Sequence, residues 1–247
     1  MPDVPVIAID GPSASGKGTV AQLVAERLGY HYLDSGAMYR AAALAAVRAG
    51  LPLHESAREE TALAKCASAM ALLFRGARVF LDGADVSVEL RSEAVGRDAS
   101  RIAALPQLRA ALLARQRAFC RAPGLVADGR DMASVVFPDA RLKVFLTAQV
   151  AERARRRAMQ MKAAQAQSNS PKGLMEKENS ATIRAPFEAI LAAVTADLLE
   201  RDRRDVQRGA APLVCVTEAR QLDTTGMSIQ QAVETVCHWY QESAGEQ

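Results

Sequence analysis

The chain has 247 residues, enough to bury a complete hydrophobic core, and we expect one α/β domain with insertions rather than two smaller domains. Its 31 basic and 28 acidic residues give a formal net charge of +3, which is too balanced for a dedicated nucleic-acid-binding protein. Any anion-binding site must therefore be local.

The cysteines and the N-terminal segment indicate the compartment. The cysteines, Cys66, Cys120, Cys215 and Cys237, form no CxxC pair, and the three histidines complete no metal-binding pattern. We interpret the cysteines as reduced, buried thiols. The start MPDVPVIAID lacks the features of a signal peptide, and no apolar run reaches membrane-spanning length. We therefore expect a cytoplasmic monomer with no membrane or nucleic-acid partner.

Short apolar runs that end in small or acidic residues predict the buried strands of a parallel sheet. These runs lie at 4–10, 125–128, 142–147 and 213–217. After the first run, apolar residues from Val20 to Leu28 share one helical face and Gly29 supplies a stop signal. A short strand at 31–33 and a helix from Gly36 follow. Strands alternating with helices are typical of an open α/β sheet.

Three further segments complete the predicted organisation. RVFLDGADVSV, at 78–88, has a central Asp-Gly between apolar residues and predicts an inserted hairpin. The polar segment at 160–184 is interpreted mostly as a mobile connection. The amphipathic stretch at 229–240 predicts a helix that packs on the core.

The segment IAIDGPSASGKGTVAQLV joins the first predicted strand to the first helix. Gly11, Gly16 and Lys17 in it satisfy the phosphate-binding pattern GxxxxGK. Its glycines let backbone N–H groups turn inward, and Lys17 can reach the terminal phosphates. A tight glycine turn with a solvated lysine is the alternative, which the strand–loop–helix setting disfavours. The predicted donor-binding residues are Gly11, Pro12, Ser13, Ala14, Ser15, Gly16, Lys17, Gly18 and Thr19.

Gly18 stands where a hydroxyl side chain usually holds magnesium. Thr19 would then have to help, or the ion would lie mostly among waters and phosphates. Asp128 ends the run LVADG and is a second candidate, with capping of the next turn as its alternative role. We therefore predict Mg²⁺ as cofactor, with Thr19 and Asp128 as candidate contacts through water.

Arginines recur in motifs that a nucleotide-hydrolysing switch would not need. The motifs are DSGAMYR (34–40), LRAALLARQR (108–117), DGRD (128–131) and ERDRRDVQR (200–208). The planar guanidinium binds phosphate through two hydrogen bonds and stays charged at any working pH. Taken singly, each arginine favours a surface ion pair, but their recurrence at loop and helix starts favours a second phosphate site.

The segment AQVAERARRRAMQMK also contains several arginines, of which Arg153 and Arg157 form an i, i+4 pair. These two side chains can close over a triphosphate and neutralise charge in the transition state, while the others are solvated or paired with Glu152. The predicted catalytic set is therefore Lys17, Arg153, Arg157 and Asp128.

In combination and order, these motifs resemble those of the bacterial cytidylate kinases, within the nucleoside monophosphate kinases. The resemblance covers nearly the whole chain, and GKGT is the form of the phosphate loop that nucleoside monophosphate kinases use. It implies a P-loop kinase core with a parallel five-stranded sheet flanked by helices, a monophosphate-binding insertion with a small sheet, and an arginine-bearing lid.

From this resemblance we expect one domain over residues 1–247. Its parts are a core at about 1–35, 105–150 and 205–247, an insertion at about 36–104 and a lid at about 151–185. The polar stretch near 163–184 is longer than is usual in the family.

The resemblance implies direct in-line transfer of the γ-phosphoryl group of ATP to CMP or dCMP. The implied acceptor residues are Ser35, Arg40, Arg109, Arg130, Asp131, Arg201, Asp205 and Arg208. Three alternatives stay open. A P-loop switch or motor would leave the arginines unexplained, and the guanine-reading motif NKxD is not found. The others are a kinase for another acceptor, such as UMP, AMP or an alcohol, and a binding module without catalysis.

Overall fold

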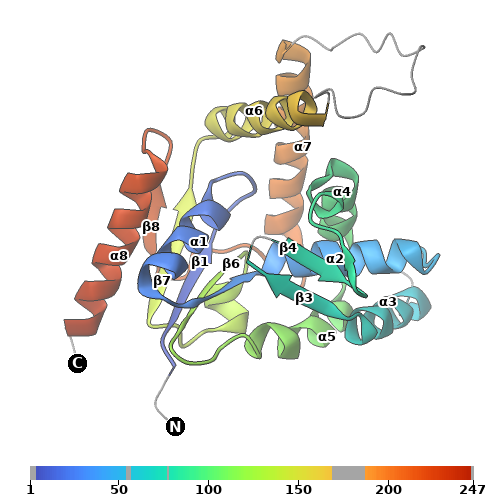
Figure 1. The fold of residues 1–247 in the computed structure, drawn as a ribbon, viewed down its shortest axis with the longest axis horizontal. Helices are drawn as coiled ribbons and strands as arrows, with labels where there is room; N and C mark the ends of the chain where they lie inside the picture. Colours follow the sequence, from blue (N-terminus) through green and yellow to red (C-terminus); the bar gives the residue numbers. More distant parts are fainter. Residues whose placement is uncertain (1–3, 54–56, 77, 169–186, 246–247) are drawn as a thin grey trace.

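The computed structural model describes residues 4–53, 57–76, 78–168 and 187–245 (Figure 1). Its central sheet has five parallel strands in the order β2-β6-β1-β7-β8. The strands are β1 (Val6–Asp10), β2 (His31–Asp34), β6 (Leu125–Gly129), β7 (Leu142–Thr147) and β8 (Arg220–Asp223). The predicted α/β fold with a parallel five-stranded core is confirmed.

Helices cover both faces of the sheet because alternate residues of each strand point to opposite sides. Ile7 and Ile9 pack with α1 (Lys17–Leu28) and α8 (Ile229–Gly245), whereas Val6 and Ala8 belong to the core under α2 (Ser35–Arg48), α3 (Ala57–Ala69) and α5 (Pro106–Arg117). Figure 1 shows α8 and α2 on opposite sides of the sheet. The C-terminal helix packs on the core, as predicted.

The fifth strand is not where the sequence pattern predicted it. Within the described part of the chain, the apolar run at 213–217 has no ladder partner, and the strand beside β7 is Arg220–Asp223, with Leu222 as its buried residue. Because β8 lies at the edge of the sheet, it is half polar and gives no continuous apolar run. Leu213 instead packs next to α7, where its N–H donates to the Asp205 carbonyl oxygen at 2.7 Å.

The predicted hairpin is present as part of a three-stranded antiparallel sheet. Its strands are β3 (Leu72–Arg75), β4 (Arg78–Leu81) and β5 (Ala84–Asp85). The β4–β5 turn is Asp82-Gly83, and both residues have positive φ values, 50° and 84°, as a type I′ turn requires. Strand β3 was not predicted. A 3₁₀ turn at Glu89–Arg91 and α4 (Glu93–Ile102) follow the hairpin.

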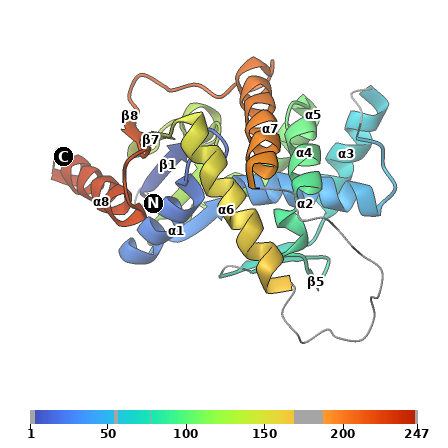
Figure 2. The same ribbon diagram turned by 90° about the horizontal axis from the view of Figure 1, so that it is seen from above.

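Two long helices lie at the carboxyl end of the sheet. α6 (Val150–Ser168) and α7 (Phe187–Gln207) pack through Ala154, Val194 and Leu198. Figure 2 shows α6 crossing above the sheet toward the side of α2 and α4. Residues 160–168, predicted as connection, are therefore helical, whereas 169–186, including Arg184, lie outside the described residues.

The cysteines and the helices can be compared with the sequence predictions. None of the cysteines is in a disulfide, but of the predicted buried thiols only Cys237 is buried, whereas Cys66 and Cys120 are half-buried and Cys215 is exposed. Over the described part of the chain, no helix has the length and apolar character to cross a bilayer.

Candidate active site

The phosphate loop follows β1 and ends at the start of α1. Ala14 and Gly16 have left-handed backbone conformations, with φ values of 59° and 94°. Alternating left- and right-handed residues turn successive N–H groups to one side and make a concave anion site. Gly11 is required for a different reason, because a Cβ atom there would lie 1.9 Å from the carbonyl oxygen of Leu146. The predicted loop therefore has the backbone form of a phosphate cradle.

Lys17 is buried behind this loop, and its Nζ donates to the Pro12 carbonyl oxygen at 3.4 Å. Burial, and then the nearby Arg130, lower the pKa of this ammonium, whereas Asp128 opposes the shift. Because burial has already removed the hydration of this ammonium, an anion that binds next to it stabilises it strongly.

Asp128 lies at the carboxyl end of β6, beside the loop. Burial and the neighbouring Asp34 raise the pKa of its carboxyl group, and Lys17 lowers it. The Tyr32 hydroxyl donates to Asp128 Oδ1 at 2.7 Å, and it lies 3.5 Å from where a Cβ of Gly18 would be. A tyrosine hydroxyl from β2 thus occupies the space next to the position that lacks the usual serine or threonine.

The cap of the next turn is Asp10, not Asp128. The two carboxylate oxygens of Asp10 accept from the backbone N–H groups of Met132 and Ala133, at 2.9 and 2.8 Å. These groups begin the single π-helical turn at Met132–Val136. Burial raises the pKa of Asp10 to about 6. Asp10 therefore ties the end of β1 to the segment that follows β6.

A cavity of about 720 Å³ opens at the carboxyl ends of the strands and reaches from the phosphate loop to α4 and α7. This is the edge of an open α/β sheet at which ligands bind. Predicted site residues that line it are Ser13, Ala14, Lys17, Gly18, Ser35, Arg40, Arg109, Asp128, Arg130, Asp131, Arg157, Arg201, Asp205 and Arg208. The structure therefore brings the whole predicted acceptor set together with Lys17.

Arg130 joins the loop to α7. Its Nε donates to Asp205 Oδ2 at 2.6 Å and its Nη2 to Ser13 Oγ at 2.7 Å. Burial alone would raise the pKa of Asp205, but Arg130 and Arg208 bring it below its usual value. A second ion pair joins Arg109 to Asp131. Both carboxylates therefore fix the direction of an arginine within the cavity.

Arg208 carries a charge that its neighbours compensate incompletely. Burial, and then the positive charge of Arg109, lower its pKa. Its Nη2 atom is buried and has no hydrogen-bond partner within the described residues. The Nε atom of Arg201 is likewise buried and has no hydrogen-bond partner among the described residues. Since an unsatisfied buried donor costs about 1–3 kcal/mol, both groups favour the arrival of an anion.

Some predicted residues do not line the cavity. Thr19 is exposed on α1. Arg153 is buried and uses its whole guanidinium on protein partners, the carbonyl oxygens of Ala148 and Ser13 and the carboxylate of Asp202. Direct contact of Arg153 with a triphosphate therefore stays a prediction. The loop residues Gly11, Pro12, Ser15 and Gly16 also lie outside the cavity lining.

Arg157 does line the cavity, where it pairs with Glu93 at the start of α4. Glu93 also accepts from Arg201 Nη2 at 2.6 Å. Burial alone would raise the pKa of Glu93, but these arginines hold it below its usual value. One carboxylate therefore links α4, α6 and α7 in the lining of the cavity.

Sequence reasoning missed Glu93 and also Ser100, whose buried Oγ atom lines the cavity and has no partner among the described residues. Neither residue belongs to a motif that was recognised, and only the folded chain brings them to the site. Tyr32 was missed for the same reason, although it directly precedes the recognised LDSGAMYR segment.

A glycine-rich loop after the first strand, a buried lysine and an adjoining arginine-lined cavity are the features of a P-loop protein. The family model described as cytidylate kinase matches residues 7–242. The chain belongs to the cytidylate kinase family, and it is a kinase.

Individual relatives agree with the family match. The cytidylate kinase of Paraburkholderia phymatum is 51% identical over 96% of this chain and 92% of its own length. That of Chromobacterium violaceum is 50% identical over 97% of this chain and 96% of its own. The cytidylate kinase of Polynucleobacter asymbioticus is 47% identical and covers 98% and 99% of the two chains. The likeness therefore spans nearly the whole chain.

Proposed function

We propose that this chain transfers the γ-phosphoryl group of ATP to CMP or dCMP and releases ADP with CDP or dCDP. Family membership supports the reaction class. The observation that carries the proposal is the single cavity lined by both Lys17 and the complete set of expected acceptor residues. A switch or motor would need no such second site, and a kinase for an alcohol would need a base and fewer arginines.

On the donor side, the loop N–H groups and Lys17 bind the phosphates of ATP. The residues present fit a magnesium ion held mainly by phosphate and water. No group of three or more potential ligands occurs among the described His, Cys, Asp and Glu residues, and Asp128 offers one carboxylate next to Lys17. Asp128 would hold a water molecule of that ion, and bound Mg²⁺ would neutralise charge on the phosphates.

On the acceptor side, Arg109, Arg130, Arg201 and Arg208 bind the monophosphate. The buried donors of Arg201 and Arg208 that lack partners support this role. Asp131 and Asp205 orient two of these arginines, and Ser35, Ser100 and Arg40 offer further polar contacts to the base or sugar. A monophosphate brings the negative charge that this cluster lacks.

In the proposed reaction, a phosphate oxygen of CMP attacks the γ-phosphorus of ATP while the bond from that phosphorus to the β–γ bridging oxygen breaks. The electron pair of that bond stays on ADP. The attacking oxygen is already anionic, so no strong general base is needed, and the work of the protein is alignment and charge neutralisation. Lys17 stabilises the charge that develops on the phosphoryl oxygens.

Water competes with CMP for the phosphoryl group, so the site must be complete only when both nucleotides are bound. We assign this closure to the insertion at about 36–104 and the lid at about 151–185. The ion pair between Glu93 of α4 and Arg157 of α6 supports this assignment, because both residues line the cavity. In the closed complex Arg157 exchanges Glu93 for phosphate, and Arg153 supports the loop from behind.

The test is phosphoryl transfer from MgATP to a panel of CMP, dCMP, UMP, AMP and glycerol, with free phosphate followed in parallel. We expect CMP or dCMP to be the best acceptor and ATP hydrolysis without acceptor to be slow. Fast hydrolysis that no monophosphate suppresses would assign the chain to the ATPases. Preference for another acceptor would replace the proposed substrate.

We further propose that the protein works as a cytoplasmic monomer. The lack of disulfides and of a bilayer-spanning helix among the described residues supports the cytoplasmic assignment. Sedimentation at working concentration tests the monomer, and a dimer mass would contradict it.

A further inference from the structure

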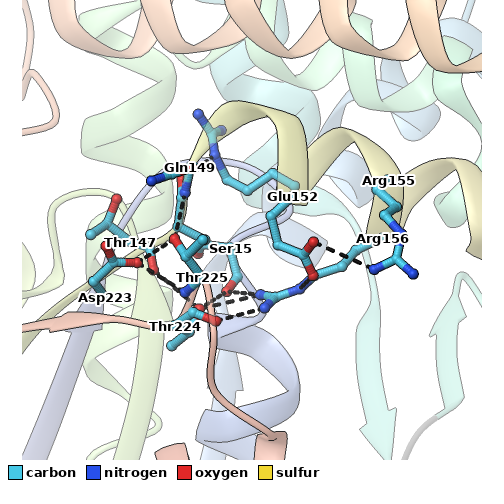
Figure 3. Close-up of polar contacts among 11 residues, drawn as sticks. Ser15, Thr147, Gln149, Glu152, Arg155, Arg156, Asp223, Thr224 and Thr225 are labelled. Atoms are coloured by element: carbon cyan, nitrogen blue, oxygen red, sulfur yellow. Dashed lines mark hydrogen bonds and ion pairs between the residues drawn. The ribbon is translucent and has the colours of Figure 1, made fainter.

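Next to the phosphate loop, and outside the lining of the cavity, lies a group of polar contacts that the proposed reaction does not use (Figure 3). At its centre is Thr224, a buried residue just after β8. Its Oγ1 atom lies 3.1 Å from the carbonyl oxygen of Ser15 and 3.1 Å from that of Thr147. The hydroxyl proton is shared between these two acceptors, and the Thr224 N–H also donates to the Thr147 oxygen at 2.9 Å.

Arg156 of α6 closes this group. Its Nη1 donates to Thr224 Oγ1 at 3.2 Å and to the Ser15 carbonyl oxygen at 3.4 Å, and its Nη2 donates to the Thr224 carbonyl oxygen at 2.7 Å. Its Nε donates to Glu152, one turn earlier on the same helix, at 2.9 Å. Every guanidinium nitrogen of Arg156 is therefore used, and two of the bonds go to Thr224 and one to the phosphate loop.

These contacts fix one peptide unit of the loop. In a trans peptide the C=O and N–H bonds point in opposite directions. Because Thr224 and Arg156 hold the Ser15 carbonyl oxygen from behind, the Gly16 N–H must face the other way. Gly16 has the left-handed φ value of 94°, a conformation that a glycine can leave at little cost without such contacts.

We propose that Thr224 and Arg156 are positioning residues that keep the Gly16 N–H directed at the phosphates of the donor nucleotide. The inference rests on the proposed function only in taking the donor to be a nucleotide phosphate. It adds residues from two distant segments to the site and gives Arg156, not only Arg153 and Arg157, a role in donor binding.

The test compares Thr224→Val, which removes the hydroxyl at nearly constant shape, with Thr225→Val. Thr225 is the matched control because its Oγ1 contacts Asp223 and the Gln149 N–H but not the loop. For Thr224→Val we expect the Kd for MgADP and the KM for ATP to rise about tenfold, because an N–H donor to phosphate is no longer held in place. The KM for CMP stays within twofold, and Thr224→Ser restores binding.

An MgADP affinity within twofold of wild type in Thr224→Val would overturn the proposal, as would an equal loss in Thr225→Val or no rescue by serine. If Thr224→Val does not fold, Arg156→Met decides the same question. Its control is Arg155→Met, since Arg155 is exposed and, among the described residues, pairs only with Glu152 through a contact of 3.6 Å. Equal MgADP affinities in these two variants would also overturn it.

MgADP binding needs no acceptor. A wild-type protein that binds MgADP but phosphorylates no CMP would therefore refute the proposed function while leaving the positioning role open to measurement. If the wild-type protein has full CMP kinase activity and Thr224→Val binds MgADP as wild type does, the proposed function is supported and the positioning role is refuted.

Discussion

The Tyr32 hydroxyl donates a 2.7 Å hydrogen bond to Asp128 Oδ1, joining β2 to β6 next to Gly18. This bond stabilises the ionised form of a carboxyl group whose pKa burial and Asp34 have raised. Deleting the hydroxyl therefore raises that pKa further, and Asp128 loses its charge at a higher pH.

We accordingly expect Tyr32→Phe to move the acid limb of the pH profile of kcat/KM for ATP upward by roughly one pH unit. Tyr30→Phe is the control, because Tyr30 makes its hydroxyl bond to Tyr240, away from the cavity. An acid limb that stays in place in Tyr32→Phe, or that moves equally in both variants, would contradict the role given to Asp128.

Replacing Lys17 should affect catalysis much more than it affects stability. Its ammonium is buried and its pKa is lowered, so the folded state gains little from the charge itself. Lys17→Met should therefore keep a Tm at or above that of wild type while kcat falls by about a hundredfold or more. Lys65→Met, at an exposed position on α3, should leave both unchanged. Near-normal turnover in Lys17→Met would be incompatible with the proposed donor site.

Replacing Arg208, on the acceptor side, should likewise lower activity without lowering stability. Arg208→Met removes a buried positive charge that lies close to Arg109 and Arg130. We expect kcat/KM for CMP to fall about a hundredfold, the KM for ATP to stay within a few-fold, and the Tm not to fall. Arg203→Met, on the exposed side of α7, is the control. Equal losses for both substrates would indicate a general structural role.

Asp10 should give the fold a measurable pH dependence. Its pKa is about 6 in the folded protein, against 3.8 as the ordinary value, so between these two pH values the folded state binds more protons than the unfolded state. The stabilisation is complete below about pH 4 and is lost as the pH rises to about 6.

The contribution of Asp10 over this window is on the order of 2–3 kcal/mol. Asp10→Asn removes the titration, so the free energy of unfolding of wild type minus that of the variant should decrease from pH 4 to pH 6. Urea unfolding at a series of pH values measures it. A constant difference would show that Asp10 does not titrate in this range.

The sequence was most informative where the site consists of contiguous motifs. The phosphate loop, DSGAMYR, DGRD and ERDRRD each place their functional side chains beside one strand or helix end, and the fold brings them to one cavity. The hairpin was predictable because Asp82-Gly83 has the residue types that its turn requires.

Residues that act across long sequence separations could not be predicted in this way. Thr224 contacts Ser15 across 209 positions, and Glu93 meets Arg157 across 64. Neither pair leaves a local pattern, because the contact depends on how β8, α4 and α6 pack. Arg153 shows that a correct local pattern can still leave a side chain's partners unknown. It has the i, i+4 spacing with Arg157, but its guanidinium binds the Ser13 carbonyl oxygen and the Asp202 carboxylate.

Strand β8 has a consequence for the behaviour of the folded protein in solution. It is four residues long, forms the edge of the sheet as the structure describes it, with β7 as its neighbour, and has Arg220 in an ion pair with Glu242 of α8. A short, charged edge offers another chain little opportunity to add a strand and start aggregation. The mixed polarity that made β8 hard to recognise in the sequence is thus the property that hinders growth of the sheet at this edge.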